Sequence, residues 1–215
     1  MKFLLAPNAF KGTFTALEAV TMLEEVLAQE YPAATYLSQA VADGGDGTCE
    51  LLIASIGLKK VCCSSLNAIG QPILGFYGWE ESSKTAYLDV STCSGIGILK
   101  PQNRNPSLTS TFGTGILIQE ALNCGAKKVV LGLGGSATVD VGAGILQAMG
   151  FLFLDEHGRE LPAFSPDFLK RSKHIQRPLK LPDISFSLLC DVKNPFFGPN
   201  GAVRVFGPQQ GIKEA

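Results

Sequence analysis

The pattern that most constrains the fold is a strand, a polar or glycine-rich loop and a helix, which recur in that order along the chain. Residues 2–6 form a short apolar run that predicts a buried strand. Thr15 and Glu18 then have the spacing of a capping box, and apolar residues at helical spacing follow. A second unit has a predicted strand at residues 35–41 and a helix at 50–56. Such alternation predicts an α/β fold with a largely parallel sheet.

The second half of the chain repeats this pattern. A helix is predicted at residues 113–123, a strand at 127–133 and another helix at 139–149. A further strand at 184–190 runs into Asp191. Ligands of open α/β sheets bind at the carboxyl ends of the strands. The loops that follow these strands are therefore the expected place of a functional site.

Residues 59–90 have a different character. Short stretches of β-branched and aromatic residues alternate there with glycines such as Gly75 and Gly78, which predicts antiparallel hairpins. A chain of 215 residues holds one large domain or two small ones. We expect the hairpin region to be a junction between two subdomains. Residues 151–154 predict another short strand, and residues 155–158 predict a hairpin turn.

The composition excludes several classes of function. Lys and Arg number 18 and Asp and Glu 19, so the formal net charge of −1 gives no general attraction for nucleic acid or anionic membranes. The six cysteines include no C-x-x-C pair, and the sequence patterns contain no zinc-ligand cluster. We expect reduced, mostly buried thiols. The apolar run before Pro7 is too short for a signal peptide, so we expect a cytoplasmic protein.

The clearest candidate for chemistry is the loop after the strand predicted at residues 127–133. Gly134, Gly135 and Ser136 form this loop, and a helix is predicted after it. Glycine lets backbone N–H groups approach an anion closely, and a helix N-terminus favours negative charge, so the loop predicts phosphate binding. It is neither a Walker A loop nor a G-x-G-x-x-G fingerprint. The alternative is a tight turn in which the glycines serve packing alone.

Two other loops carry charged residues that suit phosphate chemistry. Asp43 and Asp46 lie in the sequence DGGDGT at residues 43–48. Mg²⁺ takes one or two carboxylates together with phosphate oxygens, so Asp43 is a candidate ligand, whereas Asp46 is better explained as a helix cap. The alternative for both is a polar turn. Lys11 follows the first strand, where it would neutralise a phosphate or carboxylate; the alternative is a solvated surface lysine.

Other polar residues near strand ends have ordinary structural explanations. Asp191 ends a strand, and Ser94 lies in a loop of small polar residues that either approaches a ligand or merely turns. Thr114 stands at the start of a helix, where capping explains it at least as well as ligand binding. The two histidines lie in charged, loop-like surroundings, and neither has the serine or cysteine partner that nucleophilic catalysis needs.

Together these segments resemble the bacterial glycerate kinase family of the glycerate 2-kinase type. The resemblance covers nearly the whole chain, in the family's order. Two departures concern the loops. The family's first loop often reads P-D-S-F-K-G, where this chain has Asn8 and Ala9, and its glycine loop usually reads G-G-S-A-T-N-D-G-G, where this chain has Val139 and Val141. The matching runs are APNAFKGTFTALEA (6–19), VADGGDGT (41–48), DVSTCSGIGIL (89–99), TFGTGILIQEALNCGAKKVVLGLGGSATVDVGAGILQAMG (111–150), CDVKNPFFGPNGA (190–202) and VFGPQQG (205–211).

The third departure is length. Family members continue past the G-P-Q-x-G segment into a stretch with a G-E-G-R-x-D-x-Q-T-like motif, so the chain resembles roughly their first three fifths. The resemblance implies two α/β domains. Residues 1–70 would belong to a flavodoxin- or Rossmann-like sheet domain that looks C-terminally incomplete, and residues 71–215 to an inserted α/β domain. We expect a homodimer or a missing C-terminal partner segment.

The function implied by the resemblance is ATP-dependent phosphorylation of D-glycerate with Mg²⁺. Lys11, Asp43 and Asp191 would be catalytic. Asp43 and Asp191 would share metal binding and deprotonation of the hydroxyl group, and the sequence does not assign which does which. The residues expected to bind phosphate or substrate are Gly44, Gly45, Ser94, Thr114, Gly134, Gly135, Ser136, Asp140 and Asn194.

Two alternatives stay open at this point. The first alternative is that the chain is a non-catalytic fragment or one half of a split kinase, which follows from its shorter length. The second is a nicotinamide-dependent dehydrogenase, and it is weakened because the first loop lacks a dinucleotide-binding fingerprint.

Overall fold

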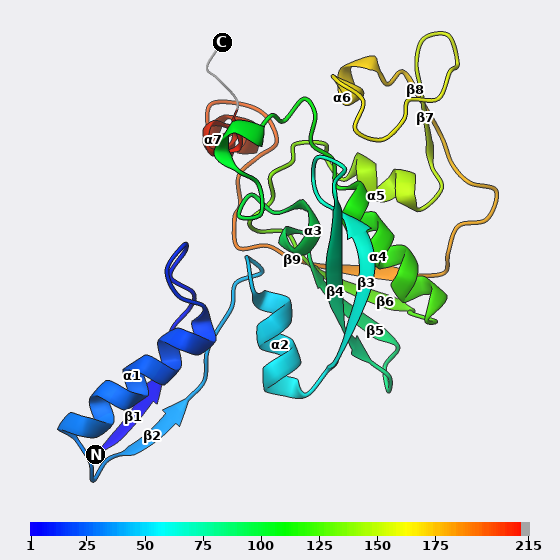
Figure 1. The fold of residues 1–215 in the computed structure, drawn as a ribbon. Helices are drawn as coiled ribbons and strands as arrows, with labels where there is room; N and C mark the ends of the chain where they lie inside the picture. The colour runs from blue at the N-terminus through cyan, green and yellow to red at the C-terminus, as the bar shows by residue number, and fades with distance from the viewer. Residues whose placement is uncertain (212–215) are drawn as a thin grey trace.

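The larger part of the molecule is built on a five-stranded mixed sheet with the order β3-β4-β5-β6-β9 (Figure 1). The computed structural model describes residues 1–211. Strands β3, β4 and β5 are antiparallel neighbours, whereas β5, β6 and β9 run parallel. The strands are β3 (Lys59–Leu66), β4 (Pro72–Glu80), β5 (Thr85–Asp89), β6 (Lys128–Gly132) and β9 (Ser185–Leu189).

The hairpins predicted for residues 59–90 are present, and they belong to the same sheet as the parallel strands. Pairing of β3 with β4 runs from Lys59 opposite Trp79 to Leu66 opposite Pro72. The domain boundary expected at residue 70 therefore falls between two strands that pair along their full length. Since β3 opens the five-stranded sheet, a division of the chain before β3 agrees better with the strand pairing.

Helices cover this sheet closely. Helix α4 (Phe112–Asn123) packs on β3 and β4, and α2 (Thr48–Ile56) packs on β4 and β5. Gly75 in β4 shows how close α4 lies, because a Cβ there would be 2.8 Å from a methyl carbon of Leu117. The buried core between these elements consists of Tyr77, Trp79, Ala86, Leu88, Val90, Cys93, Leu117, Ile118, Ala121, Ala126, Val129 and Leu131.

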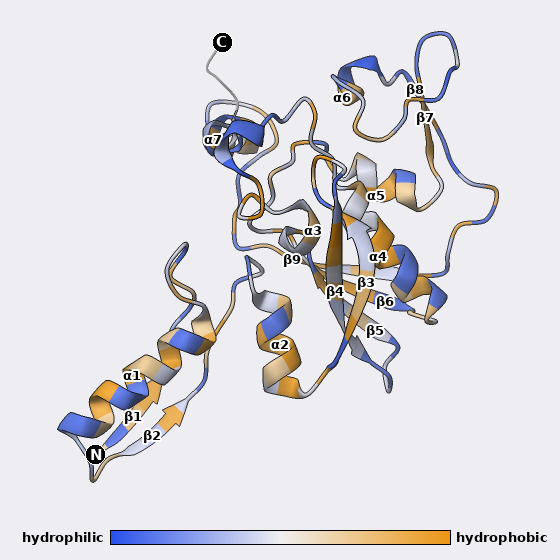
Figure 2. Ribbon diagram, viewed as in Figure 1, coloured by the Kyte–Doolittle hydropathy of each residue, from blue (hydrophilic) through white to orange (hydrophobic). Residues whose placement is uncertain are grey.

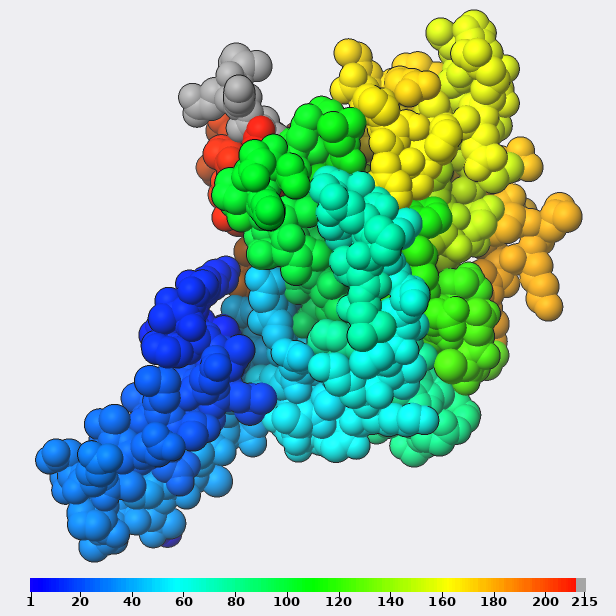
Figure 3. All heavy atoms as spheres, in the orientation of Figure 1, coloured from blue at the N-terminus to red at the C-terminus, as the bar shows by residue number. Residues whose placement is uncertain are grey.

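A small β-α-β unit projects from this body (Figures 1 and 3). It consists of β1 (Lys2–Leu5), α1 (Ala16–Glu30) and β2 (Thr35–Ser38), with β1 and β2 paired in parallel. The capping box predicted before α1 is present, since the Glu18 backbone N–H donates to the Thr15 hydroxyl and the Thr15 N–H to the Glu18 carboxylate. Figure 2 shows apolar stretches, in orange, on both α1 and β2.

One face of this two-stranded sheet is covered and the other is open. Leu5 packs with Val20 of α1 in a small buried cluster. Leu4 and Leu37, which point to the opposite face because side chains alternate along a strand, are 67% and 66% exposed. Parallel sheets are ordinarily buried on both faces, so the β-α-β unit has an uncovered apolar surface.

Helix α5 (Ala143–Ala148) begins later than the sequence predicts. The expected start was residue 139, but Val141 has a φ of 50° and Gly142 a φ of 77°. These left-handed conformations interrupt a right-handed helix, so the chain turns there and the helix starts after Gly142.

Several short elements have no counterpart in the sequence predictions. They are α3 (Ser91–Ser94), the 3₁₀-helix η1 (Pro101–Asn103), α6 (Phe168–Arg171), β8 (His174–Gln176) and α7 (Ala202–Gln210). Strand β7 (Leu152–Leu154) was predicted, and it pairs with β8. In residues 1–211 no helix combines the length and apolar character needed to cross a membrane.

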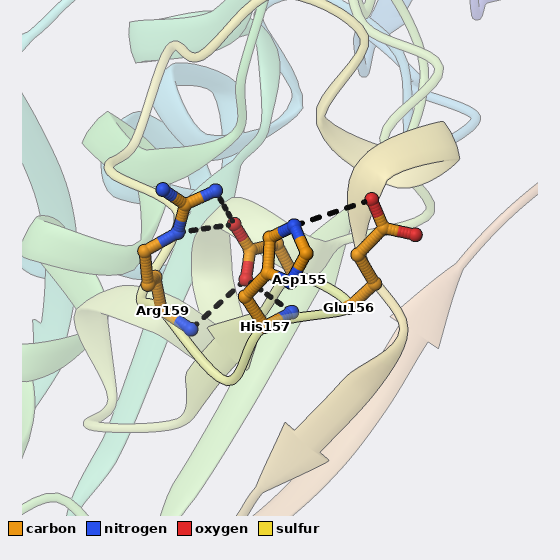
Figure 4. Close-up of polar contacts among 4 residues, drawn as sticks. All are labelled: Asp155, Glu156, His157 and Arg159. Atoms are coloured by element: carbon orange, nitrogen blue, oxygen red, sulfur yellow. Dashed lines mark hydrogen bonds and ion pairs between the residues drawn. The ribbon is translucent and has the colours of Figure 1, made fainter.

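The turn predicted after β7 is held together by one carboxylate (Figure 4). Asp155 accepts hydrogen bonds from the backbone N–H groups of His157 and Arg159 at 2.8 and 3.0 Å, and its other oxygen pairs with the Arg159 guanidinium. These donors, the Arg159 N–H first, lower the pKa of Asp155. His157 pairs with Glu156 at 3.6 Å, so this histidine is a surface turn residue.

Candidate functional site

Two glycine-rich loops meet at one edge of the five-stranded sheet. We call residues 43–47 the first glycine loop and residues 132–136 the second. Because β5, β6 and β9 are parallel, their carboxyl ends, at Asp89, Gly132 and Leu189, lie at the same edge. The first glycine loop precedes α2 and lies across this edge. The sequence analysis expected a site at the ends of these strands, and the two loops converge there.

The contact between the loops is made by backbone atoms. The Gly134 N–H donates to the carbonyl oxygen of Gly44 at 2.9 Å. Gly44 has a φ of 90°, and a Cβ at this position would lie 2.6 Å from the carbonyl oxygen of Leu189. Only glycine fits both the left-handed backbone and this approach to the end of β9.

Glycines of the second loop are needed for the same reason. A Cβ on Gly134 would lie 2.5 Å from the Cα atom of Gly45, and one on Gly135 would overlap the carboxylate of Asp46. Gly135 also has a φ of 72°. The glycines are therefore required for packing between the loops, and this packing brings the backbone of both loops together at the edge.

Asp43 connects the first glycine loop to the loop that carries Lys11. Its Oδ2 accepts a hydrogen bond of 2.8 Å from the Asn8 side-chain amide, and its Oδ1 accepts one of 3.0 Å from the Gly45 N–H. Asn8 replaces an aspartate of the family pattern. An amide donates to Asp43, whereas a second carboxylate would repel it. Lys11 lies exposed in the same loop as Asn8.

Asp191 and Asn194 follow β9. Asp191 is exposed and stands two residues after Leu189, whose carbonyl lies against Gly44. Asp43 precedes Gly44 in the sequence, so both carboxylates stand within two residues of the contact between Gly44 and Leu189. The Asn194 side chain donates to the carbonyl oxygen of Asn200 at 2.9 Å, which closes the loop between β9 and α7.

The donor set at this edge suits Mg²⁺ held mainly by phosphate and water. Among residues 1–211, no group of three or more His, Cys, Asp or Glu side chains is placed to hold a metal ion. Mg²⁺ at phosphate sites keeps several waters and needs only one or two protein carboxylates. Asp43 and Asp191 supply two, so the residues fit such an ion.

Ser94 and Thr114 lie inside the protein. Both are fully buried, their hydroxyl oxygens are 3.0 Å apart, and Thr114 donates to the carbonyl oxygen of Val90. In this structure they join α4 to α3 and to Val90, the residue between β5 and α3. Ser136 is half-buried, with its hydroxyl 2.8 Å from that of Thr138.

Asp140 binds the starts of two helices. Its Oδ2 accepts from the Thr111 N–H and hydroxyl, each at 2.8 Å, and from the Gly144 N–H at 3.1 Å. Thr111 precedes α4, and Gly144 lies in the first turn of α5. A buried carboxylate with this many protein donors holds the two helix N-termini together.

One buried carboxylate of the edge was not among the predicted site residues. Asp89 is only 3% exposed, and its Oδ2 accepts a hydrogen bond of 2.9 Å from the Cys49 N–H at the start of α2. Burial raises its pKa to about 7. The available signal was a carboxylate that ends a predicted strand, at the first residue of DVST.

An apolar cavity adjoins the second glycine loop. Its volume is about 770 Å³, and side chains of β6, β9, α5 and α7 contribute to its lining. Ser136, Thr138 and Asp140 line its polar end. Gln210 closes that end by donating to the carbonyl oxygen of Ser136 at 3.0 Å.

Comparison with known proteins gives one consistent result. The model of the family described as "Glycerate kinase family" matches residues 3–215. A glycerate kinase of Haemophilus influenzae is 37% identical over 213 residues, which is 98% of this chain and 56% of that protein. A glycerate 2-kinase of Escherichia coli is 36% identical and covers 100% of this chain and 57% of its own length.

The structural comparison agrees. A crystal structure from Salmonella typhimurium LT2 that carries the name glycerate kinase 2 superposes with a TM-score of 0.79 at 33% identity. The match covers 99% of this chain and 57% of that one. The chain therefore spans little more than half the length of the relatives it matches.

Proposed function

The chain belongs to the glycerate kinase family, and from this premise we propose that it transfers the γ-phosphoryl group of ATP to a hydroxyl group of D-glycerate. Phosphoryl transfer asks little covalent chemistry of a protein. It needs positioned phosphates, neutralised charge and a group that orients or deprotonates the attacking hydroxyl. We place the reaction at the edge where the two glycine loops meet, in a cytoplasmic enzyme.

The observation that carries this proposal is the backbone contact between Gly44 and Gly134. It brings two glycine-rich loops to the carboxyl ends of parallel strands, where α/β proteins bind phosphate-containing ligands. Backbone N–H groups of Gly135 and Ser136 would bind phosphate oxygens there. Glycine permits the close approach that this binding requires.

The charged residues around this contact have complementary roles in the proposal. Lys11 offsets the negative charge that develops on the transferred group. Asp43 and Asp191 would hold Mg²⁺, which supplies charge neutralisation of the phosphates when bound. One of the two carboxylates also accepts the proton of the attacking hydroxyl. Asp43 is held in place by Asn8 and Gly45, whereas Asp191 is exposed.

An assay of ADP release tests the proposal. The 215-residue chain is assayed with ATP, Mg²⁺ and D-glycerate, alone and mixed with a polypeptide corresponding to the remaining part of the Escherichia coli relative. ADP release that depends on D-glycerate in either arm supports the proposal. Activity only in the mixed arm supports a split kinase. Absence of glycerate-dependent release from both arms contradicts kinase function for this chain.

A further inference from the structure

Asp89 lies beneath the two glycine loops, and the proposed reaction gives it no role. It ends β5, the strand next to β6, and is 3% exposed. Its Oδ2 accepts the N–H of Cys49, which belongs to the first turn of α2. A carboxylate at a helix N-terminus fixes the position of the first turn. Because the first glycine loop leads directly into this turn, Asp89 also fixes the end of that loop.

The other oxygen of Asp89 lies against the second glycine loop. A Cβ on Gly132 would be 2.7 Å from Asp89 Oδ1 and 2.8 Å from the carbonyl oxygen of Gly44. The carboxylate and the Gly44 carbonyl thus approach the same point of Gly132. Gly44 is also the acceptor of the Gly134 N–H. The Asp89 side chain therefore contacts the start of α2 and Gly132 directly. Through Gly132 it is also linked to the first glycine loop at Gly44.

Stability alone does not account for a carboxylate at this position. Within the described residues, Asp89 Oδ1 is buried without a hydrogen-bond partner. Burying a charged oxygen without a partner costs free energy, and an asparagine would accept the Cys49 N–H without that charge. Unsatisfied buried groups of this kind are concentrated where function requires them.

Burial and two neighbouring carboxylates disfavour the charged form of Asp89. Burial is the largest cause and raises the pKa of Asp89 to about 7; Asp46 of the first loop and Glu50 of α2 also raise it, whereas the backbone N–H groups of Cys49 and Gly47 lower it. The Cys49 thiol beside it is neutral, since burial raises its pKa to about 12. Lys60 of β3 pairs with Glu50 at 3.1 Å, and β6 presents the uncharged Gly132. Asp89 is thus poised between its two forms near neutral pH.

We propose that Asp89 is a positioning residue that holds the two glycine loops in register, so that their backbone N–H groups face the phosphates of a nucleoside triphosphate together. This inference rests on the proposed function and adds a residue to its machinery. Asp89 acts through Cys49, Gly44 and Gly132, and its carboxylate does not contact the substrate.

The first test follows amide signals by nuclear magnetic resonance from pH 5 to pH 9. In the wild type, the Cys49 amide signal should titrate with a midpoint near pH 7, and the Gly134 amide signal should titrate with the same midpoint. Both titrations should disappear in Asp89→Asn and remain in Asp46→Asn. A Gly134 signal that stays fixed while Cys49 titrates would show that Asp89 supports α2 alone, and it would overturn the inference.

The second test separates this inference from the proposed function. If the wild type phosphorylates D-glycerate, Asp89→Asn should lower kcat/KM for ATP about tenfold or more at pH 8, because displaced phosphate donors lose orientation. Asp183→Asn, at an exposed site, should leave it unchanged. An unchanged kcat/KM in Asp89→Asn contradicts the inference. If the wild type is inactive, the amide titrations still decide it, so the two proposals fail independently.

Discussion

The Gly134 backbone N–H donates a hydrogen bond of 2.9 Å to the carbonyl oxygen of Gly44 and so joins the loop before α2 to the loop after β6. Neither residue contributes a side chain. The contact requires that neither residue has a Cβ atom, since a Cβ at either position would lie 2.6 Å or less from a backbone atom. The candidate site is therefore formed mainly by main-chain geometry.

Gly134→Ala should separate the two loops. Its new Cβ would lie 2.5 Å from Gly45 Cα, and overpacking of this kind typically costs about 1–3 kcal/mol. We expect a lower free energy of unfolding in urea and loss of nucleotide binding. Gly97→Ala is the matched control, because a Cβ there has no neighbour within 4 Å. Equal free energies of unfolding for the two variants would mean that the loops accommodate the new Cβ without loss of stability, which would contradict this prediction.

Val141→Gly should stabilise the protein. Val141 has a φ of 50° and is 58% exposed, so it carries backbone strain with little burial to offset it. Left-handed backbone costs an L-residue roughly 1–2 kcal/mol, and part of the gain is cancelled by the greater freedom of glycine in the unfolded chain. We expect a net gain of about 0.5–1 kcal/mol. Val139→Gly, at a position without positive φ, should destabilise instead.

Asp140→Asn should destabilise the protein by about 2–4 kcal/mol, since hydrogen bonds to a buried charged group are among the strong ones. The new NH₂ group replaces either Oδ2, which accepts from the N–H groups of Thr111 and Gly144, or Oδ1, which accepts from the Gly142 N–H at 3.3 Å, so at least one N–H donor faces another donor. Thermal unfolding measures the effect. Asp183→Asn removes an exposed carboxylate that pairs with Lys127 at 3.6 Å, and we expect it to change little. Comparable losses in both variants would show that Asp140 does not brace the helix starts.

Asp89 should make stability fall as the pH rises from about 4 to about 7. The ordinary pKa of an aspartate, 3.8, applies to Asp89 in the unfolded chain, whereas its pKa in the folded protein is about 7. Between these two pH values the unfolded chain releases a proton that the folded protein keeps. The contribution is fully present below pH 4, is lost through pH 7 and amounts to at most about 4 kcal/mol. Asp89→Asn should therefore gain stability over the wild type across this range. Urea unfolding at pH 5 and pH 8 measures the difference, and a constant difference would contradict the raised pKa.

Lys11→Ala should lower turnover far more than stability. Lys11 is exposed in its loop, so its loss removes little packing, whereas a charge that stabilises a transition state is worth about 2–4 kcal/mol. We expect a fall in kcat of about 10²-fold or more with unchanged thermal unfolding. Lys180→Ala serves as an exposed control. Activity equal to that of the wild type would show that Lys11 is a solvated surface lysine without a catalytic role.

Much of the fold follows from local patterns, and its exceptions have non-local causes. The capping box at Thr15 and the strands at β1, β6 and β9 depend on neighbouring residues, so the sequence predicts them. The late start of α5 depends on the backbone of Val141 and Gly142. The expected boundary at residue 70 separates β3 from β4, because no local pattern in the sequence records that these two strands pair.

The candidate site shows the same division. Glycine loops are visible in the sequence because glycine is the residue that such contacts require. The environment of Asp89 is not visible, since Cys49 and Gly132 reach it from distant parts of the chain. Ser94 and Thr114 resemble ligand-binding hydroxyls in sequence, yet the packing of α3 on α4 turns them toward each other.

The open face of the β1–β2 sheet has a consequence for how the molecule opens. A strand pair covered on one side buries little apolar surface, so the β-α-β unit should exchange its amide hydrogens through a partial unfolding of lower free energy than that of the five-stranded sheet. Such an opening would carry Lys11 away while the glycine loops stay ordered. The cation and the main-chain phosphate donors thus belong to parts of different rigidity, and the weaker part sets how often the complete arrangement exists.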